Sequence, residues 1–130
     1  MYTKEQQLKS WSKPKWKNRS AIDHEDYRKA TEYWGVCCIA CGNPQIEMHH
    51  VKFRSNGGSG RWRNLLPLCQ NHHKLAHTYK YIRYDYEQKM IDEFGQDYFK
   101  DEWHLYEEGK IDEPKVELME EYFNGTHATN

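Results

Sequence analysis

The residues best suited to do chemistry lie between Cys38 and His77, where cysteines and histidines are concentrated. Cys38 and Cys41 form a Cys-x-x-Cys pair, and Cys69 and His72 repeat that spacing after a longer intervening segment. Two short ligand pairs separated by a loop are a common way to assemble a closed tetrahedral zinc site. We therefore predict that these three cysteines and His72 bind a structural Zn²⁺.

A second group of polar side chains in the same segment is not needed for the zinc site. It consists of His49, His50, Asn64, His73 and His77. Hydrolysis of a phosphodiester needs an activated water in line with the leaving oxygen, and positive charge at the scissile phosphate. A histidine and one divalent cation can supply both. If the chain after Cys69 is helical, His73 and His77 lie one turn apart on the same face.

The order and spacing of these motifs resemble those of the HNH endonuclease family. The shared motifs cover residues 36 to 79, and they are Cys-x-x-Cys, Glu-x-His-His, a Gly-Gly loop, Asn-Leu-x-x-Leu-Cys and Cys-x-x-His-His-x-x-x-His. The resemblance implies a ββα-metal fold. In that fold the end of the first strand bends, so that His49 can reach the metal and His50 can reach the water, although neighbouring strand residues ordinarily face opposite sides.

The resemblance also implies a role for each residue of the second group. His50 matches the general base, Asn64 matches the residue that holds the hairpin loop and the base in place, and His73 matches the third motif position. His49 and His77 would complete a three-histidine site with His73. The implied catalytic cation is Mg²⁺ or Mn²⁺, with Ni²⁺ or Zn²⁺ as further options.

Some assignments have alternatives. His72 could be the catalytic ligand and His73 the zinc ligand, but only His72 repeats the spacing of the cysteine pair, and only His73 lies one turn before His77. Glu47 can either reach the cation or stand exposed on its strand. Cys37 is left over, and we expect a small buried thiol beside a ligand.

Cations flank the Gly-rich loop, and we expect them to hold DNA phosphates without reading sequence. The candidates are Lys52, Arg54, Arg61 and Arg63, with Lys74 on the expected helix as a further one. Trp62 can stack on a base or anchor the core. The resemblance implies that the ββα element lies in the minor groove.

The net charge of −1 hides an uneven distribution. Residues 1 to 80 contain 14 Lys and Arg against 6 Asp and Glu, a net of +8, whereas residues 81 to 130 contain 5 against 14, a net of −9. The basic part suits a polyanion such as nucleic acid, and the acidic part should lie away from the bound strand. The alternative is that both are ordinary solvated faces.

We expect a single α+β domain, in which a small ββα-metal (HNH) core with a structural zinc knuckle carries flanking helices. Its regions are a basic arm over residues 1–20, the HNH core with a preceding helix over 21–82, and an acidic helical extension over 83–130. Hydrophobic residues are 37% of the chain and aromatic residues 15%, so the core should rest on aromatic side chains with the zinc site as a staple. The expected elements are helices over 21–34, 71–81, 84–94, 96–106 and 114–123 and strands over 46–51 and 65–68.

No apolar run approaches the roughly 20 residues that span a bilayer, and the first residues lack the apolar core of a secretory signal. We therefore expect a cytoplasmic protein, in the host cytoplasm if it is phage-encoded, with no membrane partner. The four cysteines are then better explained as ligands than as disulfides.

Three functions are consistent with these patterns. The leading hypothesis is a metal-dependent HNH endonuclease that hydrolyses DNA, in double-stranded form, and leaves 5′-phosphate and 3′-hydroxyl ends as the family does. Its main rival is a non-catalytic, zinc-ribbon-like nucleic-acid-binding module. A third is a protein-interaction surface in the acidic tail, for a partner in phage recombination or packaging. RNA stays open as a substrate.

Overall fold

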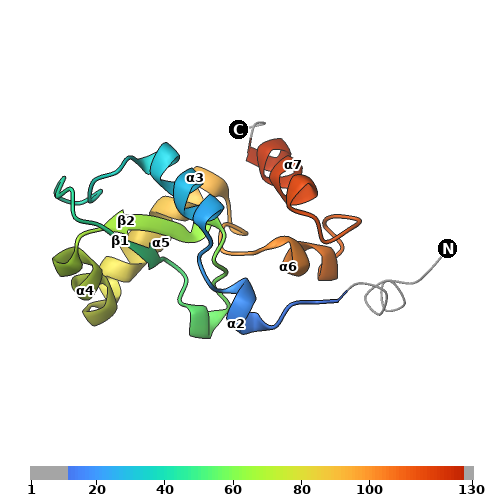
Figure 1. The fold of residues 1–130 in the computed structure, drawn as a ribbon, viewed down its shortest axis with the longest axis horizontal. Coiled ribbons are helices and arrows are strands. Elements are labelled where there is room, and N and C mark those ends of the chain that lie inside the picture. The colour runs from blue at the N-terminus through green and yellow to red at the C-terminus, as the bar shows by residue number, and fades with distance from the viewer. Residues whose placement is uncertain (1–11, 128–130) are drawn as a thin grey trace.

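The computed structural model describes residues 12–127, which form a mixed α+β fold (Figure 1). The helices and strands are, in chain order, α2 (Trp16–Arg19), α3 (His24–Trp34), β1 (Glu47–His50), β2 (Leu65–Leu68), α4 (Gln70–Thr78), α5 (Lys80–Phe94), α6 (Glu102–Glu107) and α7 (Val116–His127). Two short 3-10 turns, η1 (Arg54–Asn56) and η2 (Trp62–Asn64), lie between the strands. The α+β class with a ββα core is thus confirmed.

The ββα core consists of an antiparallel hairpin followed directly by α4. In the register of the two strands His49 lies opposite Leu66, and His50 lies opposite Leu65. Every residue of β2 is buried. Pro67 is tolerated because β2 has one unpaired edge, and its carbonyl accepts a hydrogen bond from the amide of Ile39 at 3.0 Å.

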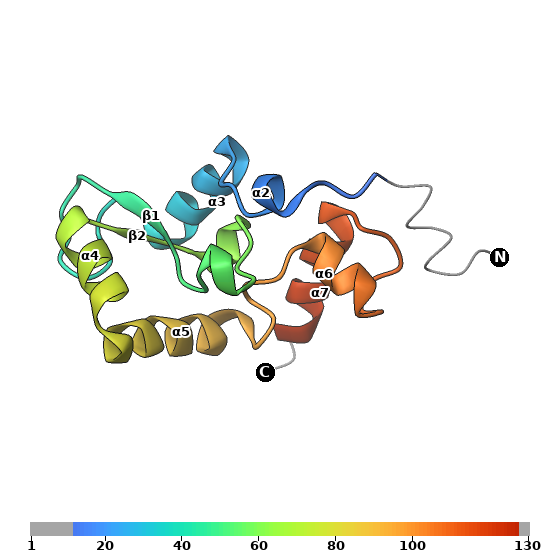
Figure 2. The same cartoon turned by 90° about the horizontal axis from the view of Figure 1, so that it is seen from below.

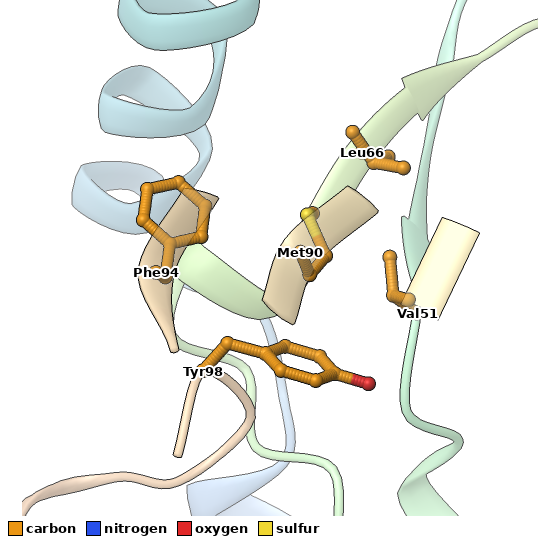
Figure 3. Close-up of a cluster of buried hydrophobic side chains, with 5 residues drawn as sticks. All are labelled: Val51, Leu66, Met90, Phe94 and Tyr98. Carbon is orange, nitrogen blue, oxygen red and sulfur yellow. The ribbon is translucent and has the colours of Figure 1, made fainter. Parts of the chain in front are cut away.

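The hairpin lies between α3 and α5 (Figure 2). Its main hydrophobic cluster joins Val51 and Leu66 to Met90, Phe94 and Tyr98, which come from α5 and the turn after it (Figure 3). Burying one side chain of this size contributes about 1.5–3 kcal/mol. The segment after residue 82 therefore supplies much of the core that supports the hairpin.

Helices α6 and α7 form a second hydrophobic cluster of their own. Its buried members are Leu105, Tyr106, Ile111, Met119 and Phe123.

Within the described residues, no helix is both long enough and apolar enough to cross a lipid bilayer.

The two oppositely charged parts of the chain contact each other. Buried or half-buried ion pairs join them: Arg19 with Asp101, Arg61 with Glu102, and Arg63 with Glu120. These carboxylates of the acidic part therefore pack against the basic part and neutralise arginines there. The expectation that the acidic part lies away from a bound strand stays a prediction.

Local signals explain where α3 begins and ends. The carboxylate of Asp23 accepts a hydrogen bond from the amide of Asp26 at 2.8 Å, which caps the helix. Gly35 ends the helix with φ of 98°, a region that favours glycine.

The N-terminal arm, which was expected to be extended, is only partly seen. Its last residues form the helix α2, and residues 1–11 lie outside the described part.

Every expected helix has somewhat different bounds in the structure, and two of these differences have a clear local cause. The one expected over 71–81 ends at Thr78, because Tyr79 is extended with φ −113° and ψ 121°, and α5 begins directly after it. The one expected over 96–106 begins only at Glu102. Asp101 caps it by accepting a hydrogen bond from the amide of His104, while its own amide donates to the His104 ring.

Candidate active site

The three cysteines and His72 converge as a closed metal site. The Cys41 and Cys69 sulfurs are 3.8 Å apart, and the Nδ1 atom of His72 lies 3.8 Å from the Cys38 sulfur and 3.1 Å from that of Cys69. A tetrahedral zinc site with Zn–S bonds of about 2.3 Å has sulfur–sulfur edges of about 3.8 Å. The donor set and its spacing thus fit a structural Zn²⁺.

The electrostatics around Cys38 also favour metal binding. Burial alone would raise the pKa of this thiol, but hydrogen bonds from the amides of Cys69, Ala40 and Cys41 lower it to about 7. A lower pKa favours the thiolate, the form that binds metal. The neighbouring Cys37 is exposed, so the expectation of a buried thiol is wrong at that position.

A second cluster brings His49 of β1 next to His73 and His77 of α4. One nitrogen from each ring can be chosen so that all three lie within 4.8 Å of one another. The Nε2 atoms of His73 and His77 are 3.2 Å apart. His49 is fully buried, and within residues 12–127 neither of its ring nitrogens has a hydrogen-bond partner. Because an unpartnered buried polar group is costly, this ring fits the role of a metal ligand.

Burial and the neighbouring histidines keep His49 neutral. Desolvation, followed by the charges of His73 and His77, lowers its pKa to about 3. Burial also lowers the pKa of His77. A neutral imidazole is the form that binds a cation, so the site is ready to bind one at neutral pH.

Glu47 fixes the orientation of His73. Its Oε1 atom lies 2.8 Å from Nδ1 of His73, so this nitrogen carries the proton and donates to the carboxylate. The lone pair is thereby left on Nε2, which faces His77. The sequence left two roles for Glu47, cation ligand or exposed strand residue. In the structure the side chain is exposed, and it also orients a candidate ligand.

His50, the last residue of β1, is held by the main chain. Its Nε2 atom lies 2.8 Å from the carbonyl oxygen of Ser20. A carbonyl only accepts, so Nε2 carries the proton and Nδ1 keeps a lone pair. Burial, opposed in part by this hydrogen bond, lowers the pKa of His50. Sequence reasoning missed Ser20, because any residue type supplies a main-chain carbonyl.

Asn64 holds the loop between the strands. Its Oδ1 atom accepts from the amide of Lys52 at 2.8 Å, and its Nδ2 atom donates to the carbonyls of Lys52 at 3.1 Å and Ser59 at 2.8 Å. These hydrogen bonds tie two parts of the loop, at Lys52 and at Ser59, to one side chain. The His50 ring, by contrast, donates its hydrogen bond to the main-chain carbonyl of Ser20.

His50, His73 and His77 face the same cleft. Its volume is about 430 Å³, and Met48, Phe53, Arg54 and Ser55 complete its walls. The Phe53 ring stacks on His77 with 4.7 Å between centroids and 10° between planes. One hollow is therefore lined by a histidine whose Nδ1 keeps a lone pair and by two histidines of a candidate metal cluster.

A family model described as HNH endonuclease matches residues 38–78. This segment is an HNH endonuclease domain. The family generally comprises nucleases that use divalent cations. Searches of curated proteins and of solved structures gave no match. The HNH domain contains all seven residues of the two clusters, and the helices before and after it lie outside the match.

Two cations beside the HNH cleft have no carboxylate partner in the described part of the chain. Arg54 is exposed and lines the cleft, and its guanidinium donates to the hydroxyl of Ser20 at 3.1 Å. Lys52 is half-buried, with Nζ 5.1 Å from the centre of the Phe99 ring. Lys74 on α4 is exposed. These three can approach a phosphate.

Arg61 and Arg63 are held inside the protein by carboxylates. Arg61 donates to both oxygens of Glu102, at 3.0 and 2.7 Å, and to Asp26 at 2.9 Å. Arg63 is only 5% exposed and pairs with Glu120. The structure thus gives both arginines internal partners, which argues against the phosphate contacts expected for them.

Trp62 is part of the core. Its ring centre lies 5.3 Å from that of Phe94, and its Nε1 atom donates to Glu120 at 3.0 Å. Of the two roles that the sequence left open, base stacking and core anchor, the structure favours the anchor.

Proposed function

We propose that this protein is a metal-dependent endonuclease that hydrolyses DNA, with His50 as general base and one divalent cation bound by His49, His73 and His77. The observation that carries the proposal is the shared cleft, because His50, whose Nδ1 keeps a lone pair, lines the same space as two of the three ligands. The match of this segment to the HNH family supports it.

The chain's own residues can move the proton that hydrolysis requires. Nδ1 of His50 takes a proton from a water, whose oxygen then bonds to phosphorus as the bond to the 3′ oxygen breaks. The leaving oxygen takes a proton from solvent, which gives 5′-phosphate and 3′-hydroxyl ends. The Ser20 carbonyl stabilises the protonated His50 ring by accepting its Nε2 proton. A bound cation would polarise the phosphate and stabilise charge on the leaving oxygen.

The donor set favours a transition metal at the catalytic site. Imidazole nitrogen suits zinc, nickel and iron, whereas Mg²⁺ prefers oxygen ligands in an octahedral shell. Among the options that the resemblance implied, we therefore propose Ni²⁺ or Zn²⁺ first, then Mn²⁺, which also prefers oxygen ligands, and Mg²⁺ last. For the cysteine cluster we propose a structural Zn²⁺ and a reducing cytoplasm, which keeps the four thiols unoxidised.

The DNA contacts that we propose are narrower than those expected from sequence. Lys52, Arg54 and Lys74 hold phosphates of a double strand near the cleft. Arg61 and Arg63 are left out because carboxylates of the chain already bind them. Contacts of this kind make affinity dependent on salt and independent of base sequence.

Plasmid nicking tests the proposal. Zinc-loaded protein with Mn²⁺ should nick a supercoiled plasmid, and His50→Ala should slow nicking by about 10²- to 10⁴-fold, the usual contribution of a general base. His24→Ala is the matched control, because His24 is exposed on α3 and does not line the cleft. The proposal fails if His50→Ala nicks as fast as the parent.

Counting metals separates the nuclease from the binding module. One tightly held zinc and one exchangeable cation support the nuclease. Two chelator-resistant zinc ions, with DNA bound but never cut, would identify a zinc-ribbon-like module.

A further inference from the structure

A second cavity lies beside the catalytic cleft, against the first turns of α5. Its volume is about 290 Å³, and its walls include Lys52, Phe53, Lys80, Arg83, Tyr84 and Glu87. We call it the α5 pocket. Phe53 lines both hollows, so they adjoin at this side chain. The α5 helix follows the segment that matches the HNH family.

The cations of the α5 pocket differ from most other cations among the described residues. Within residues 12–127, Lys52, Lys80 and Arg83 form no ion pair, whereas Arg19, Arg61, Arg63, Lys100 and Lys110 all bind carboxylates. Three cations against the single carboxylate of Glu87 leave the pocket with a net charge of +2. A concave surface with such a charge attracts an anion.

The wall between the two hollows also holds one of these cations in place. The guanidinium carbon of Arg83 lies 5.0 Å from the centre of the Phe53 ring, within the range of a cation–π contact. Phe53 in turn stacks on His77. A phosphate bound by Arg83 would therefore lie close to the catalytic cleft.

Exposed aromatic rings surround the same turns of α5. Tyr84 lines the pocket and is 63% exposed, and Tyr81 is 66% exposed. The Tyr81 ring also contacts that of Tyr79, with 5.7 Å between their centres. Aromatic rings beside cations are typical of surfaces on which nucleotides stack.

We propose that the α5 pocket is a second DNA subsite, which binds a backbone phosphate next to the scissile one while Tyr84 contacts the adjoining nucleotide. This inference rests on the proposed function. Lys80 and Arg83 supply the charge, and the shared wall at Phe53 sets the direction in which the strand leaves the cleft. The subsite contributes to binding and leaves proton transfer at His50 unchanged.

Binding measured apart from cleavage tests the subsite. The probe is a fluorescein-labelled 20-base-pair duplex, followed by anisotropy with zinc-loaded protein and no added second cation. The double variant Lys80→Gln, Arg83→Gln should bind at least about tenfold more weakly at 50 mM salt. The slope of log K against log salt should become shallower by about 0.9, the change that accompanies the loss of one neutralised phosphate.

A second double variant provides the matched control. Lys89→Gln, Lys115→Gln removes the same charge from α5 and from the residue just before α7, outside the pocket. It should change affinity less than about threefold, since a charge far from the bound strand is screened. Equal losses in the two double variants, or parental affinity in the first, would overturn the subsite.

Two further measurements keep this inference distinct from the nuclease proposal. Tyr84→Ala should weaken binding with little change in the salt slope, and Tyr84→Phe should restore affinity because the ring remains. In the nicking assay the Lys80→Gln, Arg83→Gln variant should have a higher KM than the parent, and its kcat should stay within about threefold.

If the parent binds the duplex but never nicks it, the nuclease proposal fails while the binding result still decides the subsite. If the parent does not bind it, the subsite is rejected.

Discussion

His49 and His50 are neighbours in β1, yet their surroundings prepare them for different tasks. His49 is fully buried against two other histidines, so its ring is neutral and lacks a partner in the described part of the chain. His50 is half-buried and tied to the Ser20 carbonyl, which fixes its tautomer. Strand alternation gives the two rings separate environments. His50 nevertheless lines the same cleft as His73 and His77, the two histidines that cluster with His49.

The first prediction concerns the pH dependence of nicking. Burial lowers the pKa of His50 below the ordinary value of 6.5. The neutral base is therefore retained to lower pH, and kcat/KM should fall on the acidic side with a midpoint below 6.5. The lowered pKa also affects stability. The unfolded state takes up the proton near pH 6.5, and the folded state takes it up only at lower pH. The free energy of unfolding therefore has its full value above pH 6.5 and decreases as the pH falls through the pKa of the folded state.

The measurement is kcat/KM for plasmid nicking between pH 5 and 8 at saturating Mn²⁺. Zinc content should be checked at each pH, since protons compete for the thiolates. An acidic midpoint at or above 6.5 would contradict the lowered pKa of the base.

The second prediction tests the carboxylate that orients His73. Glu47→Gln weakens the hydrogen bond to Nδ1 and loosens the ring, so affinity for Mn²⁺ should fall by about 10- to 100-fold. Zinc content should stay at the parental level, because Glu47 does not belong to the cysteine cluster. Calorimetric titration with Mn²⁺ measures the change.

Glu32→Gln is the control for this titration. Glu32 is an exposed carboxylate on α3 that pairs with Arg28. Its loss should leave the Mn²⁺ titration unchanged. Unaltered Mn²⁺ affinity in Glu47→Gln would show that the carboxylate does not position the ligand.

At the residue scale, spacing in the sequence predicted the two groups of side chains that the structure brings together, whereas only three-dimensional contacts could assign the arginines. His72 and His73 are adjacent, but their partners lie in opposite directions along the chain: Cys69 three residues before His72, and His77 four residues after His73. The fate of Arg61 and Arg63 depends on Glu102 and Glu120, which lie far along the chain. No local pattern reveals such partners.

At the scale of elements, the loop between the strands is fixed from both sides. Asn64 binds it from within, and flanking segments bind it from outside: the Ser59 amide donates to the Phe99 carbonyl, and the Gly60 amide to that of Arg19. The family motif thus depends on elements before and after it. Capped helix ends such as that at Asp23 could be predicted, but the break at Tyr79 carries no Gly or Pro signal.

The third prediction uses two adjacent glycines of this loop. A Cβ at Gly58 would lie 1.8 Å from the Lys52 carbonyl oxygen and 2.9 Å from Nδ2 of Asn64. Gly58→Ala must therefore move the main chain that Asn64 holds. We expect it to destabilise the protein by about 3 kcal/mol, at the upper end for overpacking, and to reduce nicking strongly.

Gly57→Ala is the comparison. A Cβ at Gly57 meets nothing within 4 Å, and only its φ of 91° opposes the change. The expected cost is about 1–2 kcal/mol, with most of the nicking activity retained. Urea unfolding of the two variants measures both costs, and equal losses would mean that the close approach to Lys52 is unimportant.

At the scale of the whole molecule, the segment after the HNH domain completes the fold. Met90, Phe94 and Tyr98 cover Val51 and Leu66, while carboxylates of α6 and α7 bind arginines of the N-terminal part. The sequence predicted helices here but not this role. Tyrosines and charges interrupt the apolar positions of α5, so its buried face is hard to recognise before the hairpin is in place.

The fourth prediction follows from this shared core. Met90 is fully buried, and Met90→Ala should destabilise the protein by about 2–5 kcal/mol through lost contacts and a residual cavity.

If α5 and the hairpin unfold together, urea should release zinc in the same transition that removes the helical circular dichroism signal. Met90→Ala should then shift both curves to lower urea by the same amount, even though Met90 belongs to a different hydrophobic cluster from Cys38 and Cys69. Leu118→Ala, at a half-buried position on α7, should shift them less. A zinc-release curve that stays at the parental midpoint in Met90→Ala, while the helical signal moves, would instead make α5 an accessory to an independently stable HNH domain.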